Sequence, residues 1–142
     1  MIPASQPNLE PSGRLPENHP HKGVTEIVLP ATPGSEFDFV LPMLAHLSQQ
    51  CTDRWLTWIA PRGINRQLLV QYGFALDKVR FIYTHNDQET RWLYWEALAM
   101  GNSQTVVASC ESLSEREANA LEQAALKGNA QGVLLRYRQS NW

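Results

Sequence analysis

Four histidines are the side chains best suited to acid–base or metal chemistry, and their spacing does not form a known site. His19 and His21 lie among prolines, His46 falls in an expected helix, and His85 follows an expected strand. The His-Glu-x-x-His spacing of a helical zinc site is absent. The carboxylates gather at helix starts, where negative charge favours the positive end of the helix dipole. We therefore expect no enzyme, no catalytic residue and no metal.

The first expected strand-to-helix turn carries no phosphate-binding pattern. Residues 29–36 read LPATPGSE, with one glycine, two prolines that cannot donate an N–H, and no lysine. A P-loop needs glycines and a Gly-Lys-Ser/Thr ending, and a dinucleotide site needs Gly-x-Gly-x-x-Gly. The Gly-x-Ser-x-Gly elbow of hydrolases is missing too. The sequence therefore predicts no bound nucleotide and no other cofactor.

Two segments, at 54–62 and 91–95, are rich in tryptophan and arginine. These residue types are over-represented at protein–protein hot spots, so the segments favour binding to a protein partner. Alternation along a strand places Trp55 and Trp58 on opposite faces, so either can belong to the core. We expect one of these two, and one of Trp92 and Trp95, to be core. Helix 64–72 carries more apolar residues than one buried face needs, which favours a partner surface. The two segments contain Arg54, Trp55, Trp58, Ile59, Pro61 and Arg62, then Arg91, Trp92, Tyr94 and Trp95.

The elements that would position these residues alternate between strand and helix. Apolar runs and helical spacing predict five strands and four helices in one α/β domain, with a mainly parallel sheet covered on both faces. The first, fourth and fifth strands read as continuous apolar runs, which is typical of strands buried on both faces. The expected strands are 24–29, 54–60, 79–83, 105–108 and 132–137, and the helices are 37–50, 64–72, 86–100 and 115–127.

Several helix ends are marked in the sequence. Asn86 with Glu89, and Ser114 with Glu117, each have the spacing of a capping box. Gly73 is expected just after the end of helix 64–72. Pro42 must lie in the first turn of its helix or kink it.

Composition agrees with one globular domain in a reducing compartment. The chain has 142 residues, 12 basic against 14 acidic, and 43% hydrophobic residues. The net charge of −2 argues against nucleic-acid binding by bulk electrostatics. We expect a flexible proline-rich tail at 1–23, the domain at 24–138 and a short tail at 139–142. Without a signal peptide or an apolar span, we expect a cytoplasmic protein with Cys51 and Cys110 buried and unpaired.

Three stretches resemble the SulA family, the SOS-response inhibitors of bacterial cell division that bind FtsZ. They are RWLTWIAP at 54–61, LSERE at 113–117 and LKGNAQGVLLR at 126–136, and the resemblance covers 24–136. It implies a RecA-like α/β fold, with the topology of P-loop NTPases but without Walker motifs. It also implies a non-enzymatic function, in which binding at the T7-loop face of FtsZ blocks polymerisation and GTPase activity.

The resemblance also implies which residues face FtsZ. Arg54 matches an arginine ahead of the tryptophan strand, and Lys78 matches a lysine before the third strand, so both would pair with an acidic loop. Ile59 stands where the family has leucine, and Leu68 where relatives carry tryptophan, so both would be apolar anchors. Together with two residues of the segment described above, the expected FtsZ-binding set is Arg54, Ile59, Pro61, Arg62, Leu68 and Lys78.

Further partners follow from the same resemblance. Family members are expected to form homodimers. Longer relatives carry a tail recognised by the Lon protease, whereas five residues follow Tyr137 here. The alternative is a RecA-like accessory module in DNA-damage tolerance that binds RecA or DNA, and both the net charge and the empty phosphate turn count against it. We expect neither a membrane nor a nucleic acid as partner.

Overall fold

The computed structural model describes residues 23–29, 35–111 and 113–137, which form an α/β domain around one five-stranded sheet. All strand pairs are parallel, and the strand order is β1-β5-β4-β2-β3. The predicted fold class is therefore confirmed. The strands are β1 (Gly23–Leu29), β2 (Trp55–Ile59), β3 (Val79–Ile82), β4 (Ser103–Ser109) and β5 (Gln131–Tyr137). The predicted tails 1–23 and 139–142 lie outside the described residues, except for Gly23.

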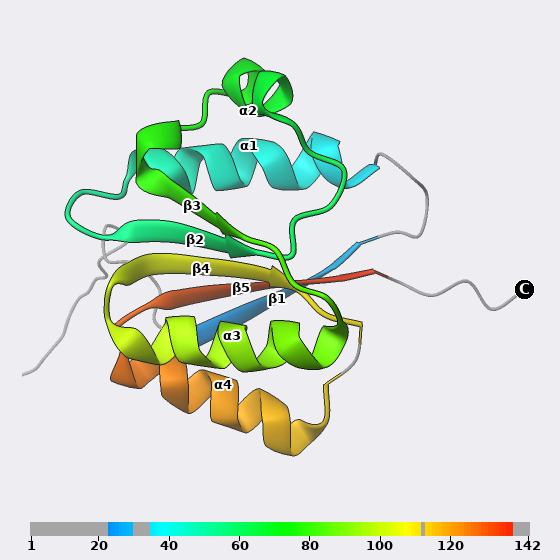
Figure 1. Cartoon of the computed structure of the whole chain (residues 1–142), viewed down its shortest axis with the longest axis vertical. Helices are drawn as coiled ribbons and strands as arrows, with labels where there is room; N and C mark the ends of the chain where they lie inside the picture. The colour runs from blue at the N-terminus through cyan, green and yellow to red at the C-terminus, as the bar shows by residue number, and fades with distance from the viewer. Residues whose placement is uncertain (1–22, 30–34, 112, 138–142) are drawn as a thin grey trace, which may run out of the picture.

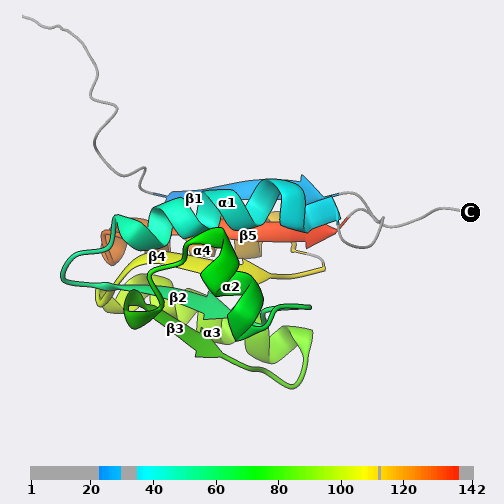
Figure 2. The ribbon, with the colours of Figure 1, turned by 90° about the horizontal axis from the view of Figure 1, so that it is seen from above.

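The four helices cover the sheet in two layers, with α1 and α2 on one face and α3 and α4 on the other (Figure 1). Seen from above, α1 and α2 both lie over the sheet on the same side (Figure 2). A short 3₁₀ turn, η1, was not foreseen. The helical segments are α1 (Ser35–Gln49), α2 (Arg66–Tyr72), η1 (Leu76–Lys78), α3 (Asp87–Met100) and α4 (Glu115–Lys127).

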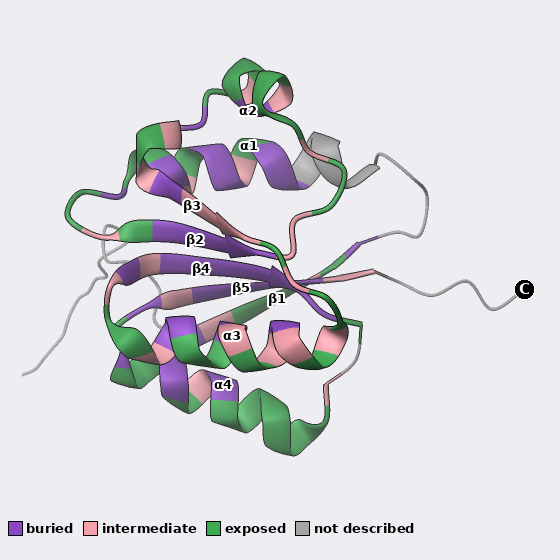
Figure 3. Ribbon diagram, viewed as in Figure 1, coloured by how far each residue is buried: buried purple, intermediate pink, exposed green. Residues whose placement is uncertain are grey.

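The two faces of the sheet have separate cores, because side chains along a strand alternate. Leu56 and Trp58 of β2 pack with α1 and α2, whereas Ile59 packs with α3 and α4. The inner surfaces of the helices and the central strands are buried, and the outer helix surfaces are exposed (Figure 3). Among the described residues, no helix is long and apolar enough to cross a membrane.

The prediction that the first strand is buried on both faces is wrong. β1 lies at the edge of the sheet beside β5, and the middle of the strand is exposed, including Val28 at 54%. Its apolar run resembles that of a central strand, but the strand order leaves it with one neighbour. The prediction holds for the other two strands, since β4 and most of β5 are buried.

The predicted helix caps are largely present. Ser114 and Glu117 form a full capping box at α4. At α3, the Asn86 side chain accepts a hydrogen bond from the Glu89 N–H, but the Glu89 carboxylate accepts from the N–H of His85 instead of Asn86. Gly73 ends α2 in the left-handed conformation, with φ of 87°. Pro42 lies inside α1, beyond the first turn.

Close approach of α3 and α4 requires the glycine at the end of α4. A Cβ atom on Gly128 would lie 1.8 Å from the carbonyl oxygen of Leu98 and 2.9 Å from its carbonyl carbon. Gly128 has φ of −84°, so its backbone conformation suits any residue. The requirement is therefore one of space between two helix backbones.

We expect Gly128→Ala to lower the free energy of unfolding by about 2–3 kcal/mol, because the new methyl group meets backbone that cannot rotate away. Urea denaturation measures the change. Lys127→Ala, at the exposed preceding position, is the control and should stay within about 0.5 kcal/mol of the wild type. Equal stability of the two variants would contradict the close approach.

Candidate functional site

Five of the six residues expected to face a partner lie at or just beyond opposite ends of the strands, and the sixth, Leu68, lies on helix α2. Arg54 and Lys78 directly precede β2 and β3. They lie at the end of the sheet where the strands begin, which we call the amino edge, and the opposite end is the carboxyl edge. Pro61 and Arg62 follow β2, at the carboxyl edge. Since a strand rises about 3.3 Å per residue, roughly 20 Å separate the two groups along β2. The residues predicted to form one partner surface therefore lie in two separate groups.

Arg54 is held by the end of helix α4. Its Nη1 donates to the carbonyl oxygen of Gly128 at 3.2 Å, and its Nη2 donates to that of Asn129 at 2.9 Å. These carbonyls lie at the negative end of the α4 dipole, where a cation is favoured. Arg54 thus joins the start of β2 to the turn before β5, and only part of its side chain remains available to a partner.

Lys78, Arg54 and Trp55 surround a shallow pocket of about 230 Å³ at the amino edge, which we call the amino-edge pocket. Its lining residues are Thr52, Asp53, Arg54, Trp55, Asp77 and Lys78. Burial raises the pKa of the nearby Cys51 thiol, and the charges of Lys78 and Arg54 partly offset this rise. The two cations expected from the sequence are therefore brought together.

Arg80 extends this group of cations and was missed in the sequence. Its Nη2 donates to the Thr57 hydroxyl oxygen at 3.1 Å, and its Cζ lies 5.7 Å from the centre of the Trp55 ring. Thr57 also shares a 2.7 Å hydrogen bond with Ser103. The sequence did carry a signal for Arg80, because it is a charged residue within the otherwise apolar stretch VRFI at 79–82.

The carboxyl-edge residues differ sharply in accessibility. Ile59 is 0% exposed and packs between the sheet and helix α3, so its side chain supports this surface without reaching it. Pro61 is half-buried and Arg62 exposed. Ala60 has φ of 56°, in the left-handed region that non-glycine residues seldom adopt. Such strained residues concentrate at functional sites, and this one directs the chain into Pro61 and Arg62.

Leu68 lies in the first turn of α2, where its N–H donates to the side chain of the N-cap residue Asn65 at 2.8 Å. Its side chain is half-buried against the core below α2. Val70, two residues on, is 58% exposed. The short helix therefore does present apolar surface, as its composition predicted.

Of the tryptophans discussed, Trp58 is core at 3% exposed, whereas Trp55 is 41% exposed. The expectation that one of Trp92 and Trp95 is core is wrong. These two are 60% and 36% exposed, and their rings stack 5.6 Å apart along α3. With residues of α4 they border an open groove of about 400 Å³. Helical spacing alone does not say which face of α3 meets the sheet.

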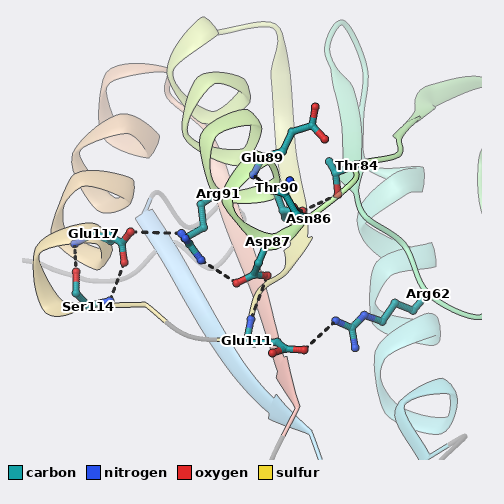
Figure 4. A network of polar contacts seen from close by, with 10 residues as sticks. All are labelled: Arg62, Thr84, Asn86, Asp87, Glu89, Thr90, Arg91, Glu111, Ser114 and Glu117. Carbon is teal, nitrogen blue, oxygen red and sulfur yellow. Dashed lines mark hydrogen bonds and ion pairs between the residues drawn. The ribbon is translucent and has the colours of Figure 1, made fainter.

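Ion pairs and hydrogen bonds link the loops at the carboxyl edge (Figure 4). Arg91 of α3 donates from Nη1 to the Asp87 carboxylate at 2.8 Å and pairs through Nε with Glu117 at 3.3 Å. Asp87 also accepts from the backbone N–H of Glu111 at 3.4 Å. The Glu111 carboxylate in turn lies 4.0 Å from the guanidinium of Arg62.

The arrangement suits binding. Within the described part of the chain, no three histidine, cysteine, aspartate or glutamate side chains are placed to hold a metal ion. Both cysteines are buried and unpaired, as expected. Arg62, Trp55 and the carboxylates of Asp53 and Asp77 are exposed, and Arg54 and Lys78 are partly exposed. Tryptophan and arginine are residue types that often supply interface anchors.

A family model described as "Cell division inhibitor SulA" matches residues 23–132. The chain is 32% identical to the cell division inhibitor SulA of Pseudomonas aeruginosa over 113 residues, which cover 79% of this chain and 70% of that protein. It is 34% identical to the SulA protein of Photorhabdus laumondii over 98 residues, but these span only 54% of the relative.

A solved structure gives the same result. The crystal structure of SulA from Pseudomonas aeruginosa is similar, with a TM-score of 0.76 and 31% identity. The similarity covers 81% of this chain and 98% of that one. Sequence and fold therefore agree over the same domain.

We expect Arg54→Ala to lower the free energy of unfolding by about 1–2 kcal/mol, because two helix-end carbonyls lose a charged donor. Urea denaturation tests this. Lys78→Ala, the control from the same pocket, should stay within about 0.5 kcal/mol of the wild type. If Arg54→Ala is as stable as that control, the hydrogen bonds to α4 do not contribute.

The Cys110 thiol should make stability fall at alkaline pH. Burial, followed by the Asp87 carboxylate, raises its pKa from 9.0 to about 12. The unfolded chain therefore loses this proton at lower pH than the folded chain, and the stabilisation present below pH 9 is lost as pH rises towards 12. Urea denaturation across this range should show a steeper decline for the wild type than for Cys110→Ala. Parallel curves would contradict the shift.

Proposed function

The chain belongs to the SulA family of cell division inhibitors, and from that premise we propose that it inhibits bacterial cell division in the SOS response by binding FtsZ. The family match over residues 23–132 is the observation that carries this proposal. The exposed Arg62 and Val70, with the partly exposed Arg54, Leu68 and Lys78, support it. The inhibitor acts as a binding protein, without a chemical step of its own, and meets FtsZ in the cytoplasm.

The proposed mechanism is occupation of the T7-loop face of FtsZ. In a polymer this face inserts into the nucleotide site of the next subunit and completes GTP hydrolysis there. An inhibitor bound to the face therefore blocks both polymer growth and GTPase activity, while GTP binding continues. A standard interface buries about 1,200–2,000 Å² in total, and we expect the contact with FtsZ to fall in this range.

We place the contact surface along the margin formed by α2 and the start of β3. This margin runs from Pro61 and Arg62 at the carboxyl edge, over Leu68, to Lys78 at the amino edge. It joins the two groups of residues that the sheet separates. Arg54 contributes the exposed part of its side chain, which lines the amino-edge pocket, whereas buried Ile59 packs on the opposite face of the sheet, with α3 and α4.

Homodimer formation and recognition by the Lon protease follow from the family resemblance. We propose both on that basis alone. Neither is needed for a single copy to occupy one FtsZ subunit.

The first experiment measures the GTPase rate and the sedimentable polymer of FtsZ from the same organism against rising amounts of this protein. Both should fall towards zero near equimolar protein, while nucleotide binding to FtsZ stays unchanged. No effect in large excess would overturn the proposal.

A matched pair of variants tests the surface. Leu68→Ala should weaken FtsZ binding by about 2 kcal/mol, or roughly 30-fold, as expected for loss of an anchor. Leu126→Ala makes the same change at a residue 49% exposed on α4, across the sheet, and should bind normally. Denaturation curves for both variants separate lost contact from lost stability. Equal affinities would place the contact surface elsewhere.

A further inference from the structure

The carboxyl ends of β2 and β4 form the point at which the chain changes direction across the sheet. From β2 the chain passes through α2 to β3 on one side, and from β4 it passes through α4 to β5 on the other. The two helices lie on opposite faces of the sheet (Figure 1). In open parallel sheets, ligands bind in the crevice at such a switch point.

A small cavity of about 10 Å³ lies beside the carboxyl ends of β2, β4 and β5, under helix α1, and has room for one water-sized group. Apolar side chains from α1, β5 and the loop after β2 form much of its wall. We call this space the switch-point cavity, and Trp58 and Ser109 are among the residues that line it. Both are 3% exposed.

The Trp58 Nε1–H and the Ser109 hydroxyl have no hydrogen-bond partner among the described residues. Buried polar groups are normally paired. Arg80, Tyr94 and Arg136 each also have one unpaired buried polar atom, but here two such groups lie beside one cavity, which indicates a bound water or ligand.

Arg62 lies at the mouth of the switch-point cavity. Its guanidinium carbon is 4.9 Å from the centre of the Tyr137 ring, and its Nη2 is 4.0 Å from the Glu111 carboxylate. Half of the Arg62 side chain is exposed, and an ion pair this long and exposed is weak. Arg62 can therefore move aside or exchange its partner at little cost.

We propose that the switch-point cavity binds a carboxylate group. One carboxylate oxygen lies inside and accepts hydrogen bonds from Trp58 Nε1 and the Ser109 hydroxyl. The other oxygen lies at the mouth and replaces Glu111 on the guanidinium of Arg62. The carboxylate comes either from a small organic acid or from an acidic side chain of a protein partner. This proposal does not depend on FtsZ being that partner.

Size and charge favour a carboxylate over a phosphate. A planar carboxylate can place one oxygen in a space suited to a single water and still reach a guanidinium with the other. A phosphate dianion would add more negative charge beside Glu111, whose backbone N–H already contacts the carboxylate of Asp87. A lone water could also satisfy the two buried groups, and the absence of a saturable shift with acetate would indicate that alternative.

Nuclear magnetic resonance of the full chain tests the proposal, because a ¹H–¹⁵N spectrum resolves the indole N–H of each of the five tryptophans. Sodium acetate is the probe, and sodium chloride at equal ionic strength is the control. The Trp58 signal is assigned from Trp58→Phe. If that variant does not fold, the signal is assigned from its proximity to Phe74 and Phe81, whose rings lie 6.1 and 6.0 Å away.

Acetate should shift the Trp58 indole signal saturably and leave the other four nearly unchanged. Ser109→Ala and Arg62→Gln should each weaken binding by about 10-fold. Arg66→Gln, at an exposed arginine of α2, should not. Glu111→Gln should tighten binding, because the internal competitor for Arg62 loses its charge. This last result separates a ligand site from a merely structural role of the cavity.

Three outcomes overturn the proposal: no saturable shift, an equal shift with chloride, or a shift that the Arg62 and Ser109 variants do not alter. Titration with free acetate and with a short peptide that has blocked termini and one free aspartate side chain then separates the two sources. Tighter binding of acetate indicates a small acid, and tighter binding of the peptide indicates a protein side chain. Either result supports a carboxylate site.

Discussion

A parallel sheet must be buried on both faces, and the rest of this domain follows from that constraint. β4 lies at the centre of the strand order and is buried almost throughout, so helices have to cover it from both sides. The chain meets this need by placing α1 and α2 on one face and α3 and α4 on the other. The carboxyl ends of β2 and β4 are paired, and the loops that leave them lead to helices on opposite faces. Arg62, Glu111 and Ala60, which has a strained backbone, all lie in these loops.

Local signals explain why the elements could be predicted from the sequence. Each helix and strand is marked by its own apolar spacing, and the capping box at Ser114 and the glycine at residue 73 act within one turn. The error at β1 has a different origin. The apolar run shows how much apolar surface a strand can bury. The strand order decides whether that strand has one neighbouring strand or two. Strand order depends on contacts across the whole chain.

The candidate site was only partly predictable for the same reason. The sequence drew attention to Arg54, but not to the carbonyls of Gly128 and Asn129 that hold it. It identified Ile59 as apolar without showing that the side chain is enclosed. It suggested one surface from residues close in sequence, although β2 carries them to opposite edges of the sheet. Because a strand is extended, residues a few positions apart on it lie much farther from each other than they would on a helix.

The pairing of β1 with β5 has a consequence for how the domain is assembled. Residues 23–29 have their sheet neighbour at 131–137, almost the entire domain later in the chain. During synthesis the first strand leaves the ribosome long before its partner exists, and contacts so distant in sequence form slowly. β1 can pair fully with β5 only when translation has passed Tyr137. Synthesis of the last strand therefore limits how soon the completed domain can become available.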